Sequence, residues 1–197
     1  EDAIRHILIR YKGFTDPTFD DIKEFYNNEL HPEKINLDDK NVWQNIFHHG
    51  KWAGIFQFTE GGAQSFCKQA KPNNITDLAA ITSIYRPGPL SAGVDKMYVG
   101  AKESPDEIEY VNDYVKQVTE ETYGFLIFQE QIAMLAHKLG KDLSLDDGNK
   151  LRKLLTKKGT GTAQKQKDKI YDKFRRGCLE KGMREYEAKE LWDKFEY

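Results

Sequence analysis

Two prolines flank a glycine in the stretch 84–90 (Ile-Tyr-Arg-Pro-Gly-Pro-Leu), where a helical pattern that begins near Asn74 ends. Proline fixes its own φ and disfavours helical geometry at the residue before it, so Arg86 and Gly88 are predicted to be extended or in a turn. The chain therefore turns sharply here, with an arginine on a stiff corner. Such a corner is either ordinary turn punctuation or a way to aim a guanidinium at a phosphate, and the local sequence leaves both readings open.

Apolar residues recur at helical spacing along most of the chain, which predicts a mainly α-helical fold. Thr18 and Ser144 are each followed by one apolar residue and two aspartates, which is typical of a helix start with a hydroxyl cap and acids in the first turn. Gly13 is a natural helix stop. The stretch 52–58 is short, aromatic and partly alternating, which predicts a minor β element. Residues 91–107 are rich in Gly, Ser, Pro and charge, so we expect a loop over the surface there.

Composition excludes several classes of protein. Charged residues make up 31% of the chain, and no apolar run approaches the ~18 residues of a membrane span. No basic stretch followed by an apolar one opens the sequence, so we expect no signal peptide and a cytoplasmic protein that does not contact a membrane. Cys67 and Cys178 are too far apart in sequence to indicate a disulfide framework or a zinc site.

Charge is distributed unevenly. Residues 148–176 contain eleven Lys and Arg against two Asp, within a chain whose formal net charge is −2. In the helix predicted over 144–158, Leu151, Leu154 and Leu155 share one face, the lysines gather opposite, and Arg152 lies at the border. The stretch 159–162 (Gly-Thr-Gly-Thr) is predicted to be a polar hinge before a second basic helix. Such a block indicates polyanion binding, and its structural alternative is a solvated helical face.

No catalytic constellation stands out in the sequence. The five histidines lack metal spacing and are better explained as structural. The acid pairs at 20–21, 38–39 and 146–147 could hold Mg²⁺, but each lies where a helix cap is expected. Gly61-Gly62 near a helix start is a weak phosphate-binding signal, and no P-loop or nucleophile elbow is present. We predict no catalytic residue and no metal ligand in this chain.

Several motifs nevertheless occur in one order. These are 54–62 (Gly-Ile-Phe-Gln-Phe-Thr-Glu-Gly-Gly), 85–90 (Tyr-Arg-Pro-Gly-Pro-Leu), Tyr123-Gly124 with 129–131 (Gln-Glu-Gln), and 151–153 (Leu-Arg-Lys) with Lys157-Lys158. Together they resemble the fingers region of the bacterial C-family replicative DNA polymerase, the polymerase III alpha subunit. The resemblance covers about residues 35–197, and the ordered set is far more specific than any single motif.

The resemblance implies a helical fingers domain over 51–197, with a basic hinge at 148–176, preceded by a helical packing segment over 1–50 that connects it to the palm domain. Its partners would be template-primer DNA, the incoming dNTP and the rest of the polymerase chain, including palm and thumb. The residues expected to bind nucleotide are Arg86, Arg152, Lys153, Lys157 and Lys158. Those expected to bind DNA are Lys150, Lys165, Lys169, Arg175 and Arg176. Lys153 stands where the family has arginine, so it keeps the charge but loses the bidentate fork.

The catalytic aspartates of the family belong to the palm, and no Asp-x-Asp pattern occurs here. We therefore expect Mg²⁺ to bind in the palm of the full polymerase and not in this fragment, which would be inactive alone. The glycine-threonine hinge and divergent loops suggest a divergent, phage-borne polymerase. The alternative hypothesis is a stand-alone, non-catalytic helical module that binds nucleic acid or protein.

Overall fold

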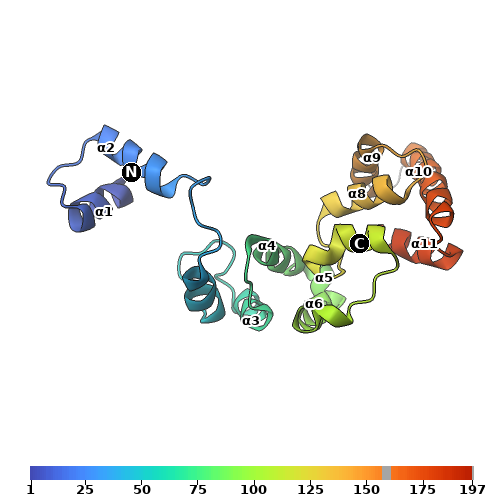
Figure 1. The fold of residues 1–197 in the computed structure, drawn as a ribbon, viewed down its shortest axis with the longest axis horizontal. Helices are drawn as coiled ribbons and strands as arrows, with labels where there is room; N and C mark the ends of the chain where they lie inside the picture. Colours follow the sequence, from blue (N-terminus) through green and yellow to red (C-terminus); the bar gives the residue numbers. More distant parts are fainter. Residues whose placement is uncertain (157–160, 197) are drawn as a thin grey trace. The chain divides into compact units, whose positions relative to one another are not determined.

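Figure 1 shows the computed structural model, which describes residues 1–156 and 161–196. These residues form helices and turns and contain no β-strand, which confirms the predicted mainly α-helical class. The chain divides into two compact units, Glu1–Asp39 and Lys40–Tyr197. This division after Asp39 lies before residue 50, where we expect the packing segment to end and the fingers domain to begin. The expected boundary at residue 50 stays a prediction.

The first unit contains α1 (Asp2–Lys12), α2 (Phe19–Phe25) and the π-helical turn η1 (Tyr26–Leu30). Helix α1 ends at Gly13, whose φ of 77° is the left-handed conformation that glycine adopts readily. Thr18 caps α2, because its hydroxyl accepts the amide hydrogen of Asp21 at 3.2 Å. Arg5 donates to the Pro17 carbonyl at 2.7 Å and so holds the connecting loop against α1. The predicted Thr18 cap and Gly13 stop are confirmed.

The second unit is a succession of mostly short helices, of which α10 has 20 residues (Figure 1). Its elements are η2 (Val42–His48), α3 (Gly61–Ala70), α4 (Ile75–Ile84), α5 (Pro87–Ser91), α6 (Val94–Glu103), η3 (Pro105–Glu107), α7 (Asp113–Thr119), η4 (Glu120–Thr122), α8 (Gln129–Leu139), α9 (Leu145–Leu155), α10 (Gly161–Glu180), α11 (Glu185–Asp193) and η5 (Lys194–Glu196).

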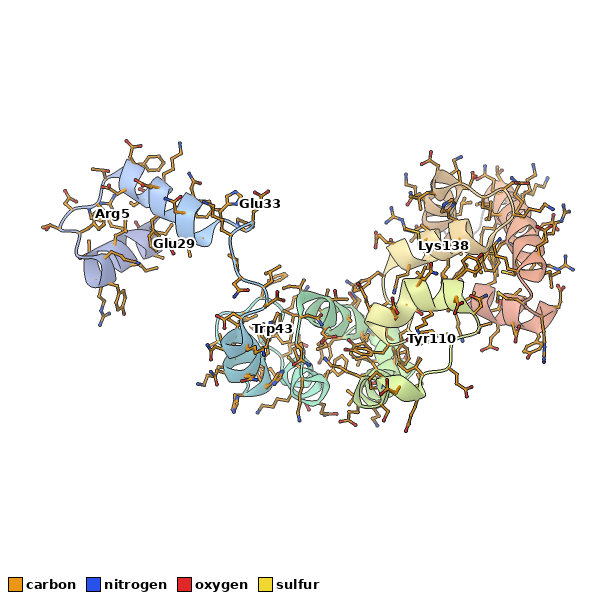
Figure 2. The ribbon with its side chains drawn as sticks, viewed as in Figure 1. Arg5, Glu29, Glu33, Trp43, Tyr110 and Lys138 are labelled. Atoms are coloured by element: carbon orange, nitrogen blue, oxygen red, sulfur yellow. The ribbon has the colours of Figure 1, made fainter. Side chains whose placement is uncertain are left out.

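An aromatic core fills the first half of this unit. Trp43 of η2, labelled in Figure 2, stacks on Phe47 with ring centroids 5.3 Å apart. Tyr98 of α6 is fully buried and meets Phe66 of α3 edge to face at 6.5 Å. Such offset and edge-on pairs are favourable beyond the area that they bury. The core therefore fixes η2, α3 and α6 around α4.

Asp77 lies fully buried at the centre of this core. Its carboxylate forms an ion pair with Lys102 of α6 and accepts the hydroxyls of Tyr98 at 3.3 Å and Tyr123 at 3.2 Å. The backbone amide of Asn73 donates to it at 3.0 Å. Burial, first, and the adjacent carboxylate raise the pKa of Tyr123 to about 12, so this hydroxyl remains a donor. A buried charge with this many partners joins α4, α6 and the turn after η4.

A second core joins α7 to α11, built around Leu135, Leu139, Leu151, Phe174 and Trp192. Two glycines let its helices approach closely. A Cβ atom at Gly148 of α9 would lie 2.3 Å from the Ala133 carbonyl oxygen of α8, and one at Gly177 of α10 would lie 2.2 Å from the Leu139 carbonyl oxygen. Figure 2 marks Lys138 on α8, which donates to Gln117 of α7 at 3.1 Å. Leu151 of α9 and Phe174 of α10, both predicted to lie on apolar helix faces, are buried in this core.

The predicted β element at 52–58 is wrong. The Ile55 amide donates to the Trp52 carbonyl at 2.9 Å and the Phe58 amide to the Ile55 carbonyl at 3.2 Å, so two consecutive turns form. Gly54 and Gln57 have φ of 78° and 67°, which an extended strand cannot contain. The aromatic content that suggested a strand comes from Trp52 and Phe58, which anchor the two ends of this loop in the core.

The surface loop expected over 91–107 is also wrong over most of its length. Residues 94–103 form α6, and the fully buried Tyr98 lies in the middle of it. The helix breakers that suggested a loop sit at the two ends. Gly93, with φ of 70°, precedes the helix, and Ser104 and Pro105 follow it. The glycine, serine and proline residues that suggested a loop therefore mark the two ends of a helix.

Candidate functional site

Arg86 occupies the corner between α4 and α5. Its backbone is extended, with φ −139° and ψ 153°, and Pro87 is the first residue of α5, so the predicted break in the helix is confirmed. The same prediction is wrong for Gly88, which lies within α5. The Arg86 carbonyl accepts the Leu90 amide at 3.0 Å, which begins the new helix at once. The guanidinium is exposed. The corner thus holds the backbone of Arg86 and leaves its charge available.

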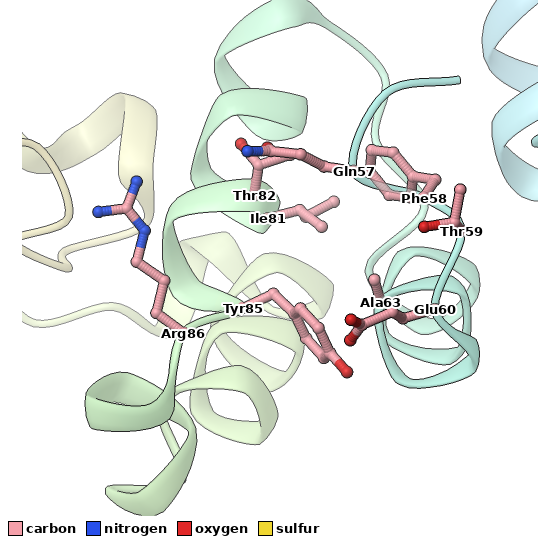
Figure 3. Close-up of a pocket in the computed structure, with 9 residues that line it drawn as sticks. All are labelled: Gln57, Phe58, Thr59, Glu60, Ala63, Ile81, Thr82, Tyr85 and Arg86. Carbon is pink, nitrogen blue, oxygen red and sulfur yellow. The ribbon is translucent and has the colours of Figure 1, made fainter. Parts of the chain in front are cut away.

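A pocket of about 290 Å³ lies beside this corner (Figure 3). Figure 3 shows Tyr85 extending toward Glu60, whereas the Arg86 side chain extends in the opposite direction, away from Glu60. The lining combines an apolar floor with amide, hydroxyl, carboxylate and guanidinium groups, from Gln57, Phe58, Thr59, Glu60, Ala63, Ile81, Thr82, Tyr85 and Arg86.

Arg152 lies on α9, one turn beyond the close approach of Gly148 to α8. Its Nη1 forms an ion pair with Glu130 Oε1 of α8 at 2.8 Å. The Arg152 side chain is 27% exposed and that of Glu130 is 76% exposed. The Nε of Arg152 is buried and has no hydrogen-bond partner among residues 1–156 and 161–196. The Arg152 guanidinium is therefore oriented by the solvent-exposed carboxylate of Glu130, and its Nε–H group makes no hydrogen bond within the described residues.

The other predicted cations of α9 differ in their surroundings. Lys153 is exposed and has no ion-pair partner in the described part of the chain. Lys150 lies 3.3 Å from Asp147, whose pKa is held below its usual range by hydrogen bonds from Ser144, the N-cap of α9. Lys157 and Lys158 lie outside the described residues, as do two positions of the predicted hinge.

Helix α10 packs against α9 and carries the remaining predicted DNA contacts. Arg175 is paired with Glu185, and Arg176 with Asp172 at 2.6 Å. Lys165 and Lys169 are exposed and form no ion pair with another residue that the structure describes. They are one helical turn apart and so project on one face. We call Lys153, Lys165 and Lys169 the unpaired lysines.

The pairing of Glu130 with Arg152 was not predicted from the sequence. The next residue, Gln131, hydrogen-bonds nearby backbone, because its Oε1 accepts the amide hydrogens of Ile127 at 2.8 Å and Phe128 at 2.9 Å. Glu130 instead reaches Arg152, 22 residues later. The only local indication of this ion pair is that Glu130 is an acidic residue in the first turn of α8, the helix that precedes the basic helix α9.

Among residues 1–156 and 161–196 there is no group of three or more His, Cys, Asp or Glu that could hold a metal ion. His48 Nε2 lies 2.9 Å from the Pro72 carbonyl and His137 Nδ1 lies 2.7 Å from the Leu143 carbonyl, which agrees with structural histidines. In the same residues, no helix is both long and apolar enough to cross a membrane.

The family model described as the bacterial DNA polymerase III alpha subunit finger domain matches residues 14–178. Since this match spans most of the chain, the protein is a polymerase finger domain and belongs to that family. The resemblance seen in the ordered motifs is confirmed.

Curated relatives agree with the family. The chain is 31% identical over 175 residues to the DNA polymerase III subunit alpha of Aquifex aeolicus and 32% identical over 172 residues to that of Campylobacter jejuni. It is 30% identical over 161 residues to that of Staphylococcus aureus. These matches cover 89%, 87% and 82% of this chain but 15%, 14% and 14% of the relatives. The chain therefore spans about one seventh of their length, and its predicted phage origin stays a prediction.

Proposed function

We propose that this chain acts as the finger domain of a DNA-directed DNA polymerase in replication, where it positions the triphosphate of the incoming dNTP and the backbone of template-primer DNA. The observation that supports this most directly is the set of exposed cations on α9 and α10 within a chain of the polymerase finger family. The palm domain would supply the catalytic carboxylates and Mg²⁺. The proposed partners of this chain are therefore the palm, the thumb and the DNA.

Arg152 and Lys153 are proposed to bind the triphosphate. In nucleotidyl transfer, negative charge builds up on the leaving pyrophosphate, and fixed cations lower the barrier by neutralising it. Arg152 is held in place by Glu130 at 2.8 Å, so less side-chain freedom is lost when a phosphate binds. Lys153 adds charge without the planar fork of arginine. The triphosphate would compete with the Glu130 carboxylate for the guanidinium.

Lys165 and Lys169 are proposed to contact the DNA backbone. Both are exposed, both lack a partner in the described residues, and their spacing follows one face of α10. Arg175 and Arg176 are already paired with acids, so binding through them would require exchange of partners. Lys150 has the same limitation through Asp147. The two unpaired lysines of α10 are therefore expected to contribute most to the affinity for DNA.

A salt titration tests this proposal. Binding of the purified chain to a fluorescent primer-template duplex is measured by anisotropy at several salt concentrations, for the wild type and for Lys165→Ala/Lys169→Ala. Each lost phosphate contact should reduce the log-log salt slope by about 0.9. Lys23→Ala/Lys116→Ala, which removes two exposed lysines from other helices, is the matched control and should leave the slope unchanged. Equal slopes for all three proteins would refute the assignment of α10.

A further inference from the structure

Phe56 is the most exposed large hydrophobic side chain recorded in the described residues, at 85%. It lies within the second of the two turns of the loop 52–58, whose end residues Trp52 and Phe58 are buried in the core. The anchored turns fix the backbone on both sides of Phe56, so this exposed ring is presented by a defined loop.

The backbone beside Phe56 is strained. Gln57 has φ of 67°, in the left-handed region that costs a non-glycine residue energy. Such conformations persist where surrounding structure enforces them, and they are frequent at binding sites. Here the strained residue lines the pocket next to Arg86, and its side chain extends toward α4, where Thr82 lies (Figure 3).

The exposed residues near Phe56 in the sequence are small or polar. Ala53, Gly54 and Gln57 are exposed, the apolar Ile55 is half-buried, and Thr59 and Glu60 are exposed polar residues that line the pocket. A protein-docking surface would be expected to present a contiguous apolar patch, whereas one exposed ring among hydrogen-bonding groups has the chemistry of base stacking.

The pocket also has a distinctive charge. It contains one cation, Arg86, and one carboxylate, Glu60. A triphosphate, with several negative charges, would be poorly matched to this pair. A single phosphodiester requires one cation, and a carboxylate can accept the amino groups on the edge of a base. With about 290 Å³, the pocket is at the small end of ligand sites and suits one base better than a base pair.

We propose that the loop 52–60 and the Arg86 corner form a subsite for one unpaired nucleotide of single-stranded DNA. Phe56, which precedes the pocket residue Gln57 but does not itself line the pocket, stacks on a base at the pocket's edge; Gln57 and the pocket hydroxyls hydrogen-bond the edge of that base, and Arg86 neutralises the adjacent phosphate. The inference rests on the proposed function, which supplies DNA as the substrate, and it adds a contact to the unpaired part of the template.

Two DNA probes test the subsite with the chain as given. One is a blunt fluorescent duplex, and the other has the same duplex with a single-stranded 5′ extension. The wild type should bind the extended probe more tightly. Phe56→Ala should lower affinity for the extended probe on the order of tenfold while leaving blunt-duplex binding unchanged, and Phe56→Trp should retain it. Phe19→Ala, which removes an aromatic ring that is 62% exposed in the first unit, is the matched control.

The outcomes separate the two proposals. If Lys165→Ala/Lys169→Ala weakens binding to both probes but Phe56→Ala binds both like the wild type, the subsite is refuted and the function stands. If the wild type binds neither probe, both proposals fail. A loss confined to the extended probe in Phe56→Ala and also in Arg86→Ala supports the subsite, whereas a loss in Phe56→Ala of binding to both probes, with unchanged circular dichroism, refutes its selectivity for unpaired DNA.

Discussion

The close approach of α9 to α8 predicts that Gly148→Ala destabilises the chain, although alanine favours helices. The new Cβ would lie 2.3 Å from the Ala133 carbonyl oxygen and 3.0 Å from its carbonyl carbon, whereas ordinary contact begins at 3.4 Å. Helix α9 would have to move by about 1 Å, because no side-chain rotation moves a backbone carbonyl. The same movement would shift Arg152, one turn further along, away from Glu130.

The size of the effect follows from two opposing terms. Replacing a helical glycine by alanine gains roughly 1 kcal/mol, and overpacking a core costs typically 1–3 kcal/mol, with backbone clashes at the upper end. We expect a net loss of about 1–2 kcal/mol in the free energy of unfolding. For a unit of this length that lowers Tm by roughly 2–8 °C.

Gly100→Ala is the matched control, because a Cβ there meets nothing within 4 Å in the middle of α6. It should raise the free energy of unfolding by about 0.5–1 kcal/mol. Both variants are measured by urea unfolding followed by far-ultraviolet circular dichroism. If Gly148→Ala is as stable as the wild type or more stable, the close packing of α8 and α9 does not constrain this position and the reasoning is refuted.

Two further predictions concern buried groups. Lys102→Met leaves the carboxylate of Asp77 buried without its cation, so it should lower the free energy of unfolding, measured in urea, by about 3–5 kcal/mol. The double variant Lys102→Met/Asp77→Asn should lose less than Lys102→Met alone, and additive losses from the two changes would contradict a coupled pair. Burial raises the pKa of Cys67 to about 11 and that of Cys178 to about 12, so neither thiol should react with an aromatic disulfide reagent until the chain unfolds. Because the native thiols keep their protons above the ordinary pKa of 9.0, the free energy of unfolding should fall as the pH rises from about 8 to about 10, and a rise would contradict these shifts.

Features that depend on neighbouring residues could be predicted from the sequence. Thr18 and Ser144 each accept the amide hydrogen of the residue three positions later, so a short motif contained the whole interaction. The separation of Leu151 from Lys150 and Lys153 on α9 follows in the same way from helical periodicity. These elements place the basic residues on α9 and α10, which is the part of the candidate site that the sequence contained.

Features that depend on distant residues could not be predicted. The burial of Asp77 depends on Lys102 and Tyr123, which lie 25 and 46 positions later, and no local pattern relates these residues. The partner of Arg152 lies 22 positions earlier. The left-handed backbone of Gln57 is likewise enforced by the anchored turns around it and has no signature in its own residue type.

The distances along the chain that separate Asp77 from its partners have a consequence during synthesis. Chains grow at about 5–20 residues per second, so Tyr123 is added roughly 2–9 s after Asp77. During that interval the Asp77 carboxylate lacks the hydroxyl of Tyr123, whereas Tyr98 and Lys102, 21 and 25 positions after Asp77, have already been added. The complete set of partners of Asp77 is therefore available only after residue 123 has been added, although most of the aromatic core comes from residues 43–98.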